Sequence, residues 1–189
     1  TSTRLVGNVQ PLKPGHDIDA IAVASYGAGR SFPEGAEANP SLLSRGKAQE
    51  AVLGRVYTSF GSTRCWGFAA EGLSRESVEL SRGAFPTQKG DVAVPADWAK
   101  ELGAEVGEQL KLSYLDSDTQ QWRTAAGRIV AVMKSNSYIS QYPVTTLGTL
   151  NELRRTEAPN ALLVRWSSRT PPASGVKRLK SLYSPEQII

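Results

Sequence analysis

The only histidine of the chain, His16, stands in the sequence GHDID, where its imidazole could act with nearby carboxylates as a metal ligand or as an acid–base pair. A protein metal site needs about three or four converging ligands, and no second histidine exists to join this one. A serine–histidine–aspartate arrangement would also need His16, and the G-x-S-x-G turn that presents such a serine is missing. We therefore interpret His16 as a surface residue of a turn and expect no metal ligand there.

Other residues with chemical potential also fail to form a catalytic pattern. The sequence YGAGRSFPEG at 26–35 has a G-x-G but lacks the third glycine of a dinucleotide-binding turn, and no P-loop motif occurs in the chain. Glu71, Glu76 and Glu79 could be paired carboxylates of the glycosidase kind, but almost any chain of this length offers such pairs. The single cysteine, Cys65, cannot form an internal disulfide and is typical of a buried apolar side chain. We expect no catalytic residue and no cofactor in this chain.

The composition is that of an ordinary folded chain with a mild positive charge. Among 189 residues, 40% are hydrophobic and 21% are charged, and the formal net charge is +4. The basic residues are spread along the sequence apart from the cluster at 177–180, whereas a nucleic-acid binder usually concentrates them on one element. No segment reaches the roughly 18–20 apolar residues of a membrane span. Because the sequence begins at Thr1 without a methionine, we interpret it as an excised fragment.

Hydrophobic periodicity and turn residues predict an α+β fold with a strand-rich middle. Strands are expected near 5–9, 19–30, 56–73, 77–85, 109–115, 121–134 and 160–166, with a bulge at Gly61 or Gly67. Helices are expected at 41–54, 145–155 and 176–183. This order suggests a mixed αβ subdomain made of 1–55 and 135–189, into which a small β-rich subdomain of residues 56–134 is inserted. The loop at 26–40 and the linker at 167–175, within the 167–189 tail, are candidates for function only because long loops often carry it.

The most ordered pattern in the chain is GDVAVPADWAKELGAEVGEQLKL at 90–112. It predicts a strand that ends at Pro95, which suits the first turn of a helix because its missing N–H would have no partner there. The residues expected to pack from one helical face are Trp98, Ala99 and Leu102. Gly103 stands where a left-handed C-cap is wanted, and Gly107 turns the chain into the next strand. Turn geometry and core packing explain every one of these residues, so the unit carries no chemistry.

Together with its flanks, this unit resembles the extracytoplasmic domain of FtsX-like, MacB-type ABC-transporter permeases. The matching pieces are VELSRGAFP (78–86), GDVAVP (90–95), PADWAKELG (95–103), EVGEQLKL (105–112) and the returning strand WRTAAGRIVAVM (122–133). The motif positions are Gly83, Pro86, Gly90, Pro95, Leu102, Gly103 and Gly107. The rest of the chain matches only in the general order of its elements.

The resemblance implies a non-catalytic domain on the extracytoplasmic side of the cell membrane, built from a porter-like αβ subdomain and an inserted β-rich one. Its implied partners are the transmembrane helices of its own permease, a separate ATP-binding subunit that acts through them, and a second permease copy. Such a domain would couple ATP hydrolysis in the cytoplasm to export of a substrate or to a protein partner outside the membrane. The resemblance implies no cofactor in this chain and no nucleic-acid partner.

Two alternatives remain open at the level of sequence. The 90–112 stretch also resembles the swapped-hairpin fold of AbrB-type DNA-binding proteins, and an exported ligand-binding protein would suit the composition. DNA binding favours Lys and Arg on the paired strands. Within 90–112, two basic residues stand against five acidic ones: Lys100 and Lys111 against Asp91, Asp97, Glu101, Glu105 and Glu108. This local acidity argues against a surface that faces phosphates.

Overall fold

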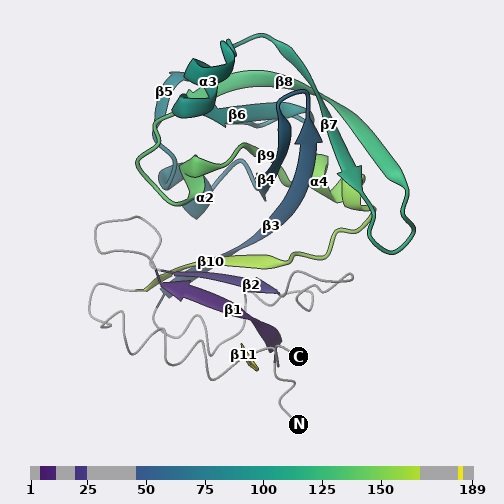
Figure 1. Ribbon diagram of the computed structural model, residues 1–189. Helices are drawn as coiled ribbons and strands as arrows, with labels where there is room; N and C mark the ends of the chain where they lie inside the picture. The colour runs from purple at the N-terminus through teal and green to yellow at the C-terminus, as the bar shows by residue number, and fades with distance from the viewer. Residues whose placement is uncertain (1–4, 12–19, 25–45, 167–182, 185–189) are drawn as a thin grey trace. The chain divides into compact units, whose positions relative to one another are not determined.

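The computed structural model describes residues 5–11, 20–24, 46–166 and 183–184 (Figure 1). The chain divides into two compact units, of which unit 1 comprises Thr1–Ala51 with Ala158–Ile189 and unit 2 comprises Val52–Glu157. The boundaries thus fall at 51/52 and 157/158, whereas the sequence suggested 55/56 and 134/135. His16, the loop predicted at 26–40 and the linker predicted at 167–175 lie outside the described residues.

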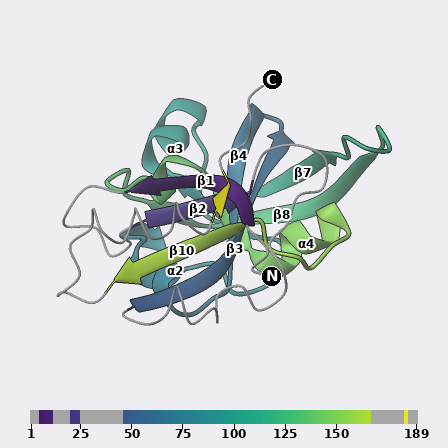
Figure 2. The same cartoon turned by 90° about the horizontal axis from the view of Figure 1, so that it is seen from below.

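Unit 1 is built on one sheet. Its strands, in order across the sheet, are β11 (Tyr183–Ser184), β1 (Leu5–Pro11), β2 (Ala20–Ala24), β10 (Ala161–Trp166) and the first part of β3 (Gly46–Thr58). Figure 2 shows β1, β2, β10 and β3 side by side, and β10 is antiparallel to both β2 and β3. The side chains of Ala161 to Val164 are fully buried without alternation, as in the middle strand of a covered sheet. Tyr183, which the sequence placed at the end of a helix, lies in β11; the rest of that predicted helix lies outside the described residues.

The prediction of a helix at 41–54 is wrong for the residues from Gly46 onward, because these residues form part of strand β3. The register of this strand runs from Trp166↔Gly46 to Ala161↔Ala51 against β10, and it continues against the next strand of unit 2. Ala51, Val52 and Leu53 are all buried. A short run of consecutive apolar residues has the same appearance in a buried strand and in a buried helix, so periodicity alone could not separate the two.

The strands of unit 2 form a closed ring. In order they are the second part of β3, β4 (Gly61–Phe68), β9 (Val144–Thr146), β6 (Asp91–Pro95), β8 (Trp122–Met133) and β7 (Gln109–Leu115), while β5 (Leu80–Gly83) pairs with the far end of β8. The ring closes where Tyr57 of β3 pairs with Ser113 of β7. The helices are α2 (Leu73–Glu76), α3 (Ala96–Leu102), the 3-10 turn η2 (Ile139–Gln141) and α4 (Leu147–Arg154). The closing contact is a single residue pair, and β5 pairs with β8 alone, so closure reduces the unpaired edges of the sheet without removing them.

The core of unit 2 consists of ring side chains with two leucines from α4, Ala99 of α3 and Ala104. The main members are Val52, Val56, Cys65, Val92, Val94, Leu112, Ile129, Val132, Leu150 and Leu153. A Cβ at Gly67 would lie 2.9 Å from Cδ1 of Leu150, so this glycine allows α4 to approach β4 closely. The sequence predicted a bulge at Gly61 or Gly67, but the β3–β4 register is continuous and Gly61 belongs to the hairpin turn. The α+β class is compatible with these elements.

The 90–112 stretch folds as strand, helix and strand. Pro95 is the last residue of β6 and the N-cap of α3, so the helix begins one residue later than the sequence suggested. Gly103 is the C-cap with φ 62°, and Ala104 N donates to Ala99 O at 3.0 Å. This hydrogen bond from beyond a left-handed glycine is the Schellman ending of a helix. The sequence prediction of a C-cap at Gly103 is therefore confirmed.

One packing prediction in this stretch is wrong. Ala99 is 7% exposed and belongs to the core, and Trp98 is half-buried against it. Leu102, predicted to pack from the same helical face, is 37% exposed. The helix is only two turns long, and Leu102 is its last residue.

The turn before β6 depends on a glycine in β5. Gly83 has φ +81°, and a Cβ there would lie 2.0 Å from the carbonyl oxygen of Val130. Pro86, three residues on, is buried, and Gly90 (φ +86°) precedes β6. A side chain at Gly83 is excluded both by the backbone conformation and by the close approach of β8.

We predict that Gly83→Ala lowers the free energy of unfolding by about 3 kcal/mol or more, because left-handed strain and overpacking each contribute about 1–3 kcal/mol. Gly103→Ala is the matched control. Gly103 also has positive φ, but nothing lies within 4 Å of its added Cβ, so the loss should be about 1 kcal/mol. Urea unfolding followed by circular dichroism measures both. Equal losses for the two variants would contradict the close approach at Gly83.

Candidate functional site

Cys65 is not a reactive thiol. Its side chain is fully buried in the core of unit 2, and burial raises its pKa to about 12. Since the thiolate is the reactive form of cysteine, the thiol is inert near neutral pH. The structure thus agrees with the sequence interpretation of Cys65 as a packing residue.

The glutamates singled out in the sequence do not form a catalytic pair. Glu79 forms an exposed ion pair with Lys134 and accepts a hydrogen bond from Asn136 at 2.7 Å. The hydrogen bond and the charge of Lys134 lower the pKa of this carboxyl group, so it stays ionised. Glu71 and Glu76 lie on the surface around α2. No group of His, Cys, Asp and Glu in the described residues could hold a metal ion.

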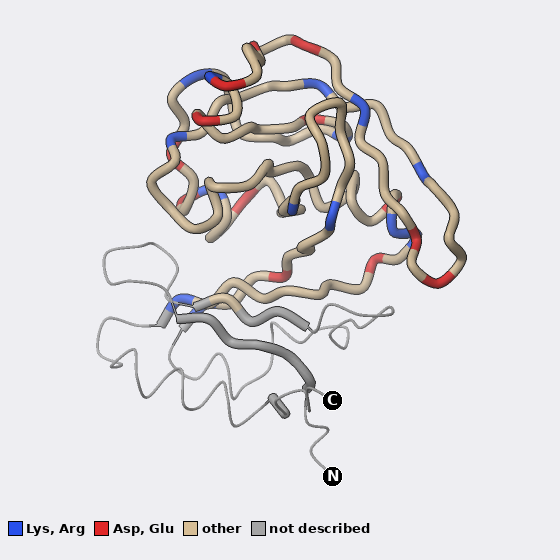
Figure 3. Tube along the Cα trace, in the orientation of Figure 1, with Lys and Arg blue, Asp and Glu red and all other residues tan. Residues whose placement is uncertain are grey.

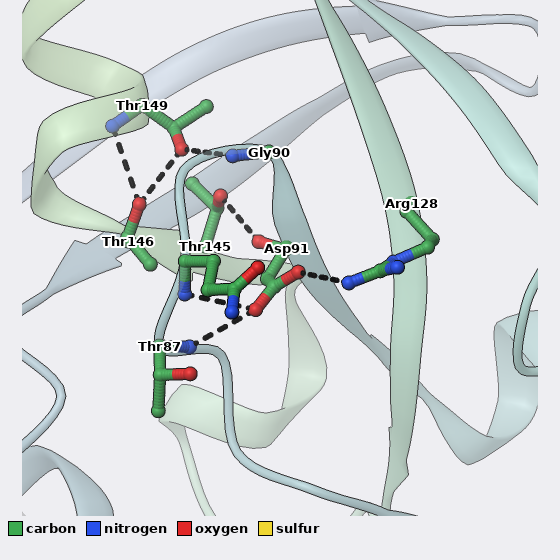
Figure 4. Close-up of polar contacts among 8 residues, drawn as sticks. Thr87, Gly90, Asp91, Arg128, Thr145, Thr146 and Thr149 are labelled. Carbon is green, nitrogen blue, oxygen red and sulfur yellow. Dashed lines mark hydrogen bonds and ion pairs between the residues drawn. The ribbon is translucent and has the colours of Figure 1, made fainter.

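The most concentrated set of buried polar contacts surrounds Asp91, the first residue of β6 (Figure 4). Asp91 is 5% exposed, and its Oδ2 accepts hydrogen bonds from Gln88 N at 2.9 Å and Thr87 N at 3.2 Å. Its Oδ1 accepts from Nη2 of Arg128, on β8, at 3.2 Å. Burial alone would raise the pKa of Asp91, but the two backbone N–H groups and the guanidinium outweigh it, and the pKa is lowered.

Threonines extend this network to β9 and α4. Thr145 Oγ1 donates to the carbonyl oxygen of Asp91 at 2.7 Å, and Gly90 N donates to Thr149 Oγ1 at 2.9 Å. The hydroxyls of Thr146 and Thr149 share a hydrogen bond of 2.7 Å. Thr146 also caps α4, because its Oγ1 accepts a hydrogen bond from Thr149 N at 3.3 Å. We call Thr87, Gly90, Asp91, Arg128, Thr145, Thr146 and Thr149 the Asp91 network.

The Asp91 network is suited to holding structure and unsuited to proton transfer. The carboxylate already accepts three hydrogen bonds and remains ionised well below neutral pH, so it is neither an available base nor an acid. No histidine in the described residues could activate a hydroxyl near it. Sequence reasoning recognised Gly90 but missed Arg128 and the threonines, because their contacts join segments that lie 37 to 59 residues apart.

An open groove lies at the end of α4. Its volume is about 480 Å³, and it is lined by Gly148, Asn151, Glu152, Arg155, Thr156 and Glu157. The lining has no large apolar side chain, whereas small-molecule sites are mostly apolar with a few placed polar groups. Glu152, in this lining, forms an ion pair with Lys89. The groove therefore does not favour the exported ligand-binding alternative.

Comparison with known proteins finds similarity in structure and none in sequence. No protein-family model and no curated protein sequence matches the chain. The crystal structure of the periplasmic region of MacB from Actinobacillus actinomycetemcomitans matches with a TM-score of 0.50 and 14% identity, covering 82% of this chain and 74% of that one. The extracellular domain of the noncanonic ABC-type transporter YknZ from Gram-positive bacteria matches with a TM-score of 0.57 and 12% identity, covering 82% and 83%. The chain has the fold of an ABC-transporter extracytoplasmic domain.

This finding confirms the resemblance that residues 78–133 suggested. Within the transporter-domain fold, the motif glycines and prolines lie at turns and caps. Gly83 and Gly90 precede β6, Pro95 and Gly103 bound α3, and Gly107 (φ +102°) leads into β7. None of the helices in the described part of the chain has the length and apolar character of a membrane span.

We predict that Asp91→Asn lowers the free energy of unfolding by about 1–3 kcal/mol at pH 7, because it removes the charge from buried hydrogen bonds and leaves Arg128 without its carboxylate. The pKa of Asp91 is lower in the folded state than in the unfolded state, where it is about 3.9. The ionised carboxylate therefore stabilises the fold above the unfolded pKa. This stabilisation is lost as the pH falls through the folded pKa. The difference between wild type and variant should therefore shrink below about pH 4.

Denaturant unfolding at several pH values measures this difference. Asp118→Asn is the control, because Asp118 is exposed in the β7–β8 loop and should change stability by less than about 0.5 kcal/mol. A difference for Asp91→Asn that stays constant from pH 7 to pH 3 would show that the charge of Asp91 contributes nothing.

Proposed function

We propose that this chain is the non-catalytic extracytoplasmic domain of an FtsX-like ABC-transporter permease. The observation that carries the proposal is the fold shared with the MacB and YknZ domains over 82% of the chain. The chemistry of unit 2 supports it, because the buried thiol is inert and the buried carboxylate is held ionised by hydrogen bonds. In this reading the ATP-binding subunit, the transmembrane helices and a second permease copy are the partners, and the chain itself needs no cofactor.

The domain would receive motion from the membrane helices and pass it to a substrate or to a protein partner outside the membrane. Unit 2 is built for such a role. Its strands close into a ring around a single core, and the Asp91 network fixes α4, β6, β8 and β9 to one another. A closed, hydrogen-bonded unit moves as a rigid body more readily than it deforms.

The same ring speaks against the AbrB-like alternative. In a swapped hairpin, the strand before the Pro–helix unit pairs with a second chain. Here β6 pairs with β8 and β9 of its own chain, so no strand of this unit is left to be completed by a partner. The carboxylates of α3 and the turn after it are also exposed, which disfavours a phosphate-facing surface.

The location is tested by labelling a surface cysteine in the natural, full-length protein in intact cells. Asp118→Cys places a thiol in the exposed β7–β8 loop, and the native Cys65 is a built-in negative control because it is buried with a pKa of about 12. We expect a membrane-impermeant maleimide to label Asp118→Cys from outside intact cells above the level of the wild type, to which Cys65 adds no labelling.

Two further samples make the result interpretable. A cytoplasmic thiol protein must stay unlabelled in intact cells, and permeabilised cells give the full labelling of Asp118→Cys. Labelling that occurs only after permeabilisation would place the domain in the cytoplasm and overturn the proposed function.

A further inference from the structure

Unit 2 exposes a group of large apolar side chains at α3. Leu102 is 37% exposed, Val106 in the following turn is 45% exposed, and Phe60 at the tip of the β3–β4 hairpin is 38% exposed. The rings of Phe60 and half-buried Trp98 meet edge to face with centroids 6.2 Å apart, so the hairpin tip lies against α3. We call Phe60, Trp98, Leu102 and Val106 the α3 patch.

Acidic side chains surround the α3 patch. Asp97, Glu101, Glu105 and Glu108 are exposed along α3 and the turn after it, near the top of Figure 3. In the described part of the chain, none of these four forms an ion pair with a basic side chain. The exposed basic residues of the same stretch are Lys100 and Lys111, so the acids exceed them by four to two.

Elsewhere in unit 2 the acidic residues are mixed, since Asp118 and Glu157 are exposed and form no ion pair in the described part of the chain, whereas four others have a basic partner. Glu79, Asp91, Asp116 and Glu152 each pair with a Lys or Arg. The α3 patch therefore combines apolar side chains exposed to water with carboxylates that form no ion pair and outnumber the basic residues of the same stretch by four to two. Both features leave free energy to be gained when a partner buries the apolar side chains and brings positive charge to their rim.

The negative charge around the α3 patch favours some classes of binding partner over others. Anionic lipid headgroups and nucleic-acid phosphates would be repelled by it. A second copy that met the same patch would bring like charges together. We propose that the α3 patch binds a basic segment with apolar side chains in a protein partner of the transporter. The location of that partner outside the membrane rests on the proposed function.

The test uses the 189-residue chain and a fluorescent synthetic amphipathic peptide of leucine and lysine, with a leucine–glutamate peptide of the same pattern as its counterpart. We expect the lysine peptide to bind and the glutamate peptide not to bind. The variants Glu101→Lys/Glu105→Lys and Leu102→Ser/Val106→Ser should each weaken binding on the order of tenfold, measured by fluorescence anisotropy.

Two control variants separate the α3 patch from general stickiness. Trp122→Ser removes a large side chain that is 56% exposed and lies outside the patch, and Glu157→Lys reverses an exposed charge near α4. Both should change affinity by less than about twofold, since exposed positions outside an interface contribute little to binding. Equal weakening by control and patch variants, equal binding of the two peptides, or no binding of the lysine peptide would each overturn the proposal.

The same variants test whether a second copy of the chain or an anionic lipid surface binds the α3 patch instead. Wild-type self-association is measured by sedimentation, and membrane binding is measured with phosphatidylglycerol vesicles. If either is present and disappears in Leu102→Ser/Val106→Ser, the patch binds a second copy or a lipid surface, which would contradict the proposal. This test is independent of the labelling of Asp118→Cys. If labelling placed the domain in the cytoplasm while the peptide results held, the binding patch would stand and the proposed function would fall.

Discussion

The hydrogen bonds around Asp91 join parts of unit 2 that no local sequence preference brings together. The carboxylate fixes the turn before β6, holds Arg128 of β8, and through its own backbone carbonyl holds Thr145 of β9. β6 lies between β8 and β9 in the ring, so its placement decides whether the ring closes. A buried charge stabilises a fold only when its partners are in place, which makes the Asp91 network a condition for the correct arrangement and not merely an addition to it.

The same constraint bears on the reactive groups of unit 2. The groups that could react are committed to structure, with the Cys65 thiol in the core and the Asp91 carboxylate saturated by donors. The surface of unit 2 carries exposed apolar side chains and carboxylates without ion pairs around α3. A hydrogen-bonded ring that presents such a surface suits the proposed role of transmitting motion and contacting partners, while the MacB and YknZ domains share its fold.

The sequence predicts features whose cause is local. Pro95 and Gly103 bound a short helix because of their own backbone preferences, and the turn after Leu115 joins two strands of clear periodicity. Features that depend on distant neighbours were missed. The strand at Gly46–Gly54 is decided by its pairing with β10 and β4, and the contact of Asp91 with Arg128 spans 37 residues. The exposure of Leu102, the last residue of α3, is also a property of the folded surroundings that helical periodicity does not contain.

The most direct test of the central claim is ATP hydrolysis by the natural protein isolated from its membranes, measured beside the 189-residue chain alone. If the chain is the non-catalytic domain of a transporter, the membrane preparation contains an ATP-binding subunit or domain and hydrolyses MgATP, while the isolated chain neither binds nor hydrolyses it. A natural protein that purifies without any ATP-binding component, or hydrolysis by the isolated chain, would contradict the account.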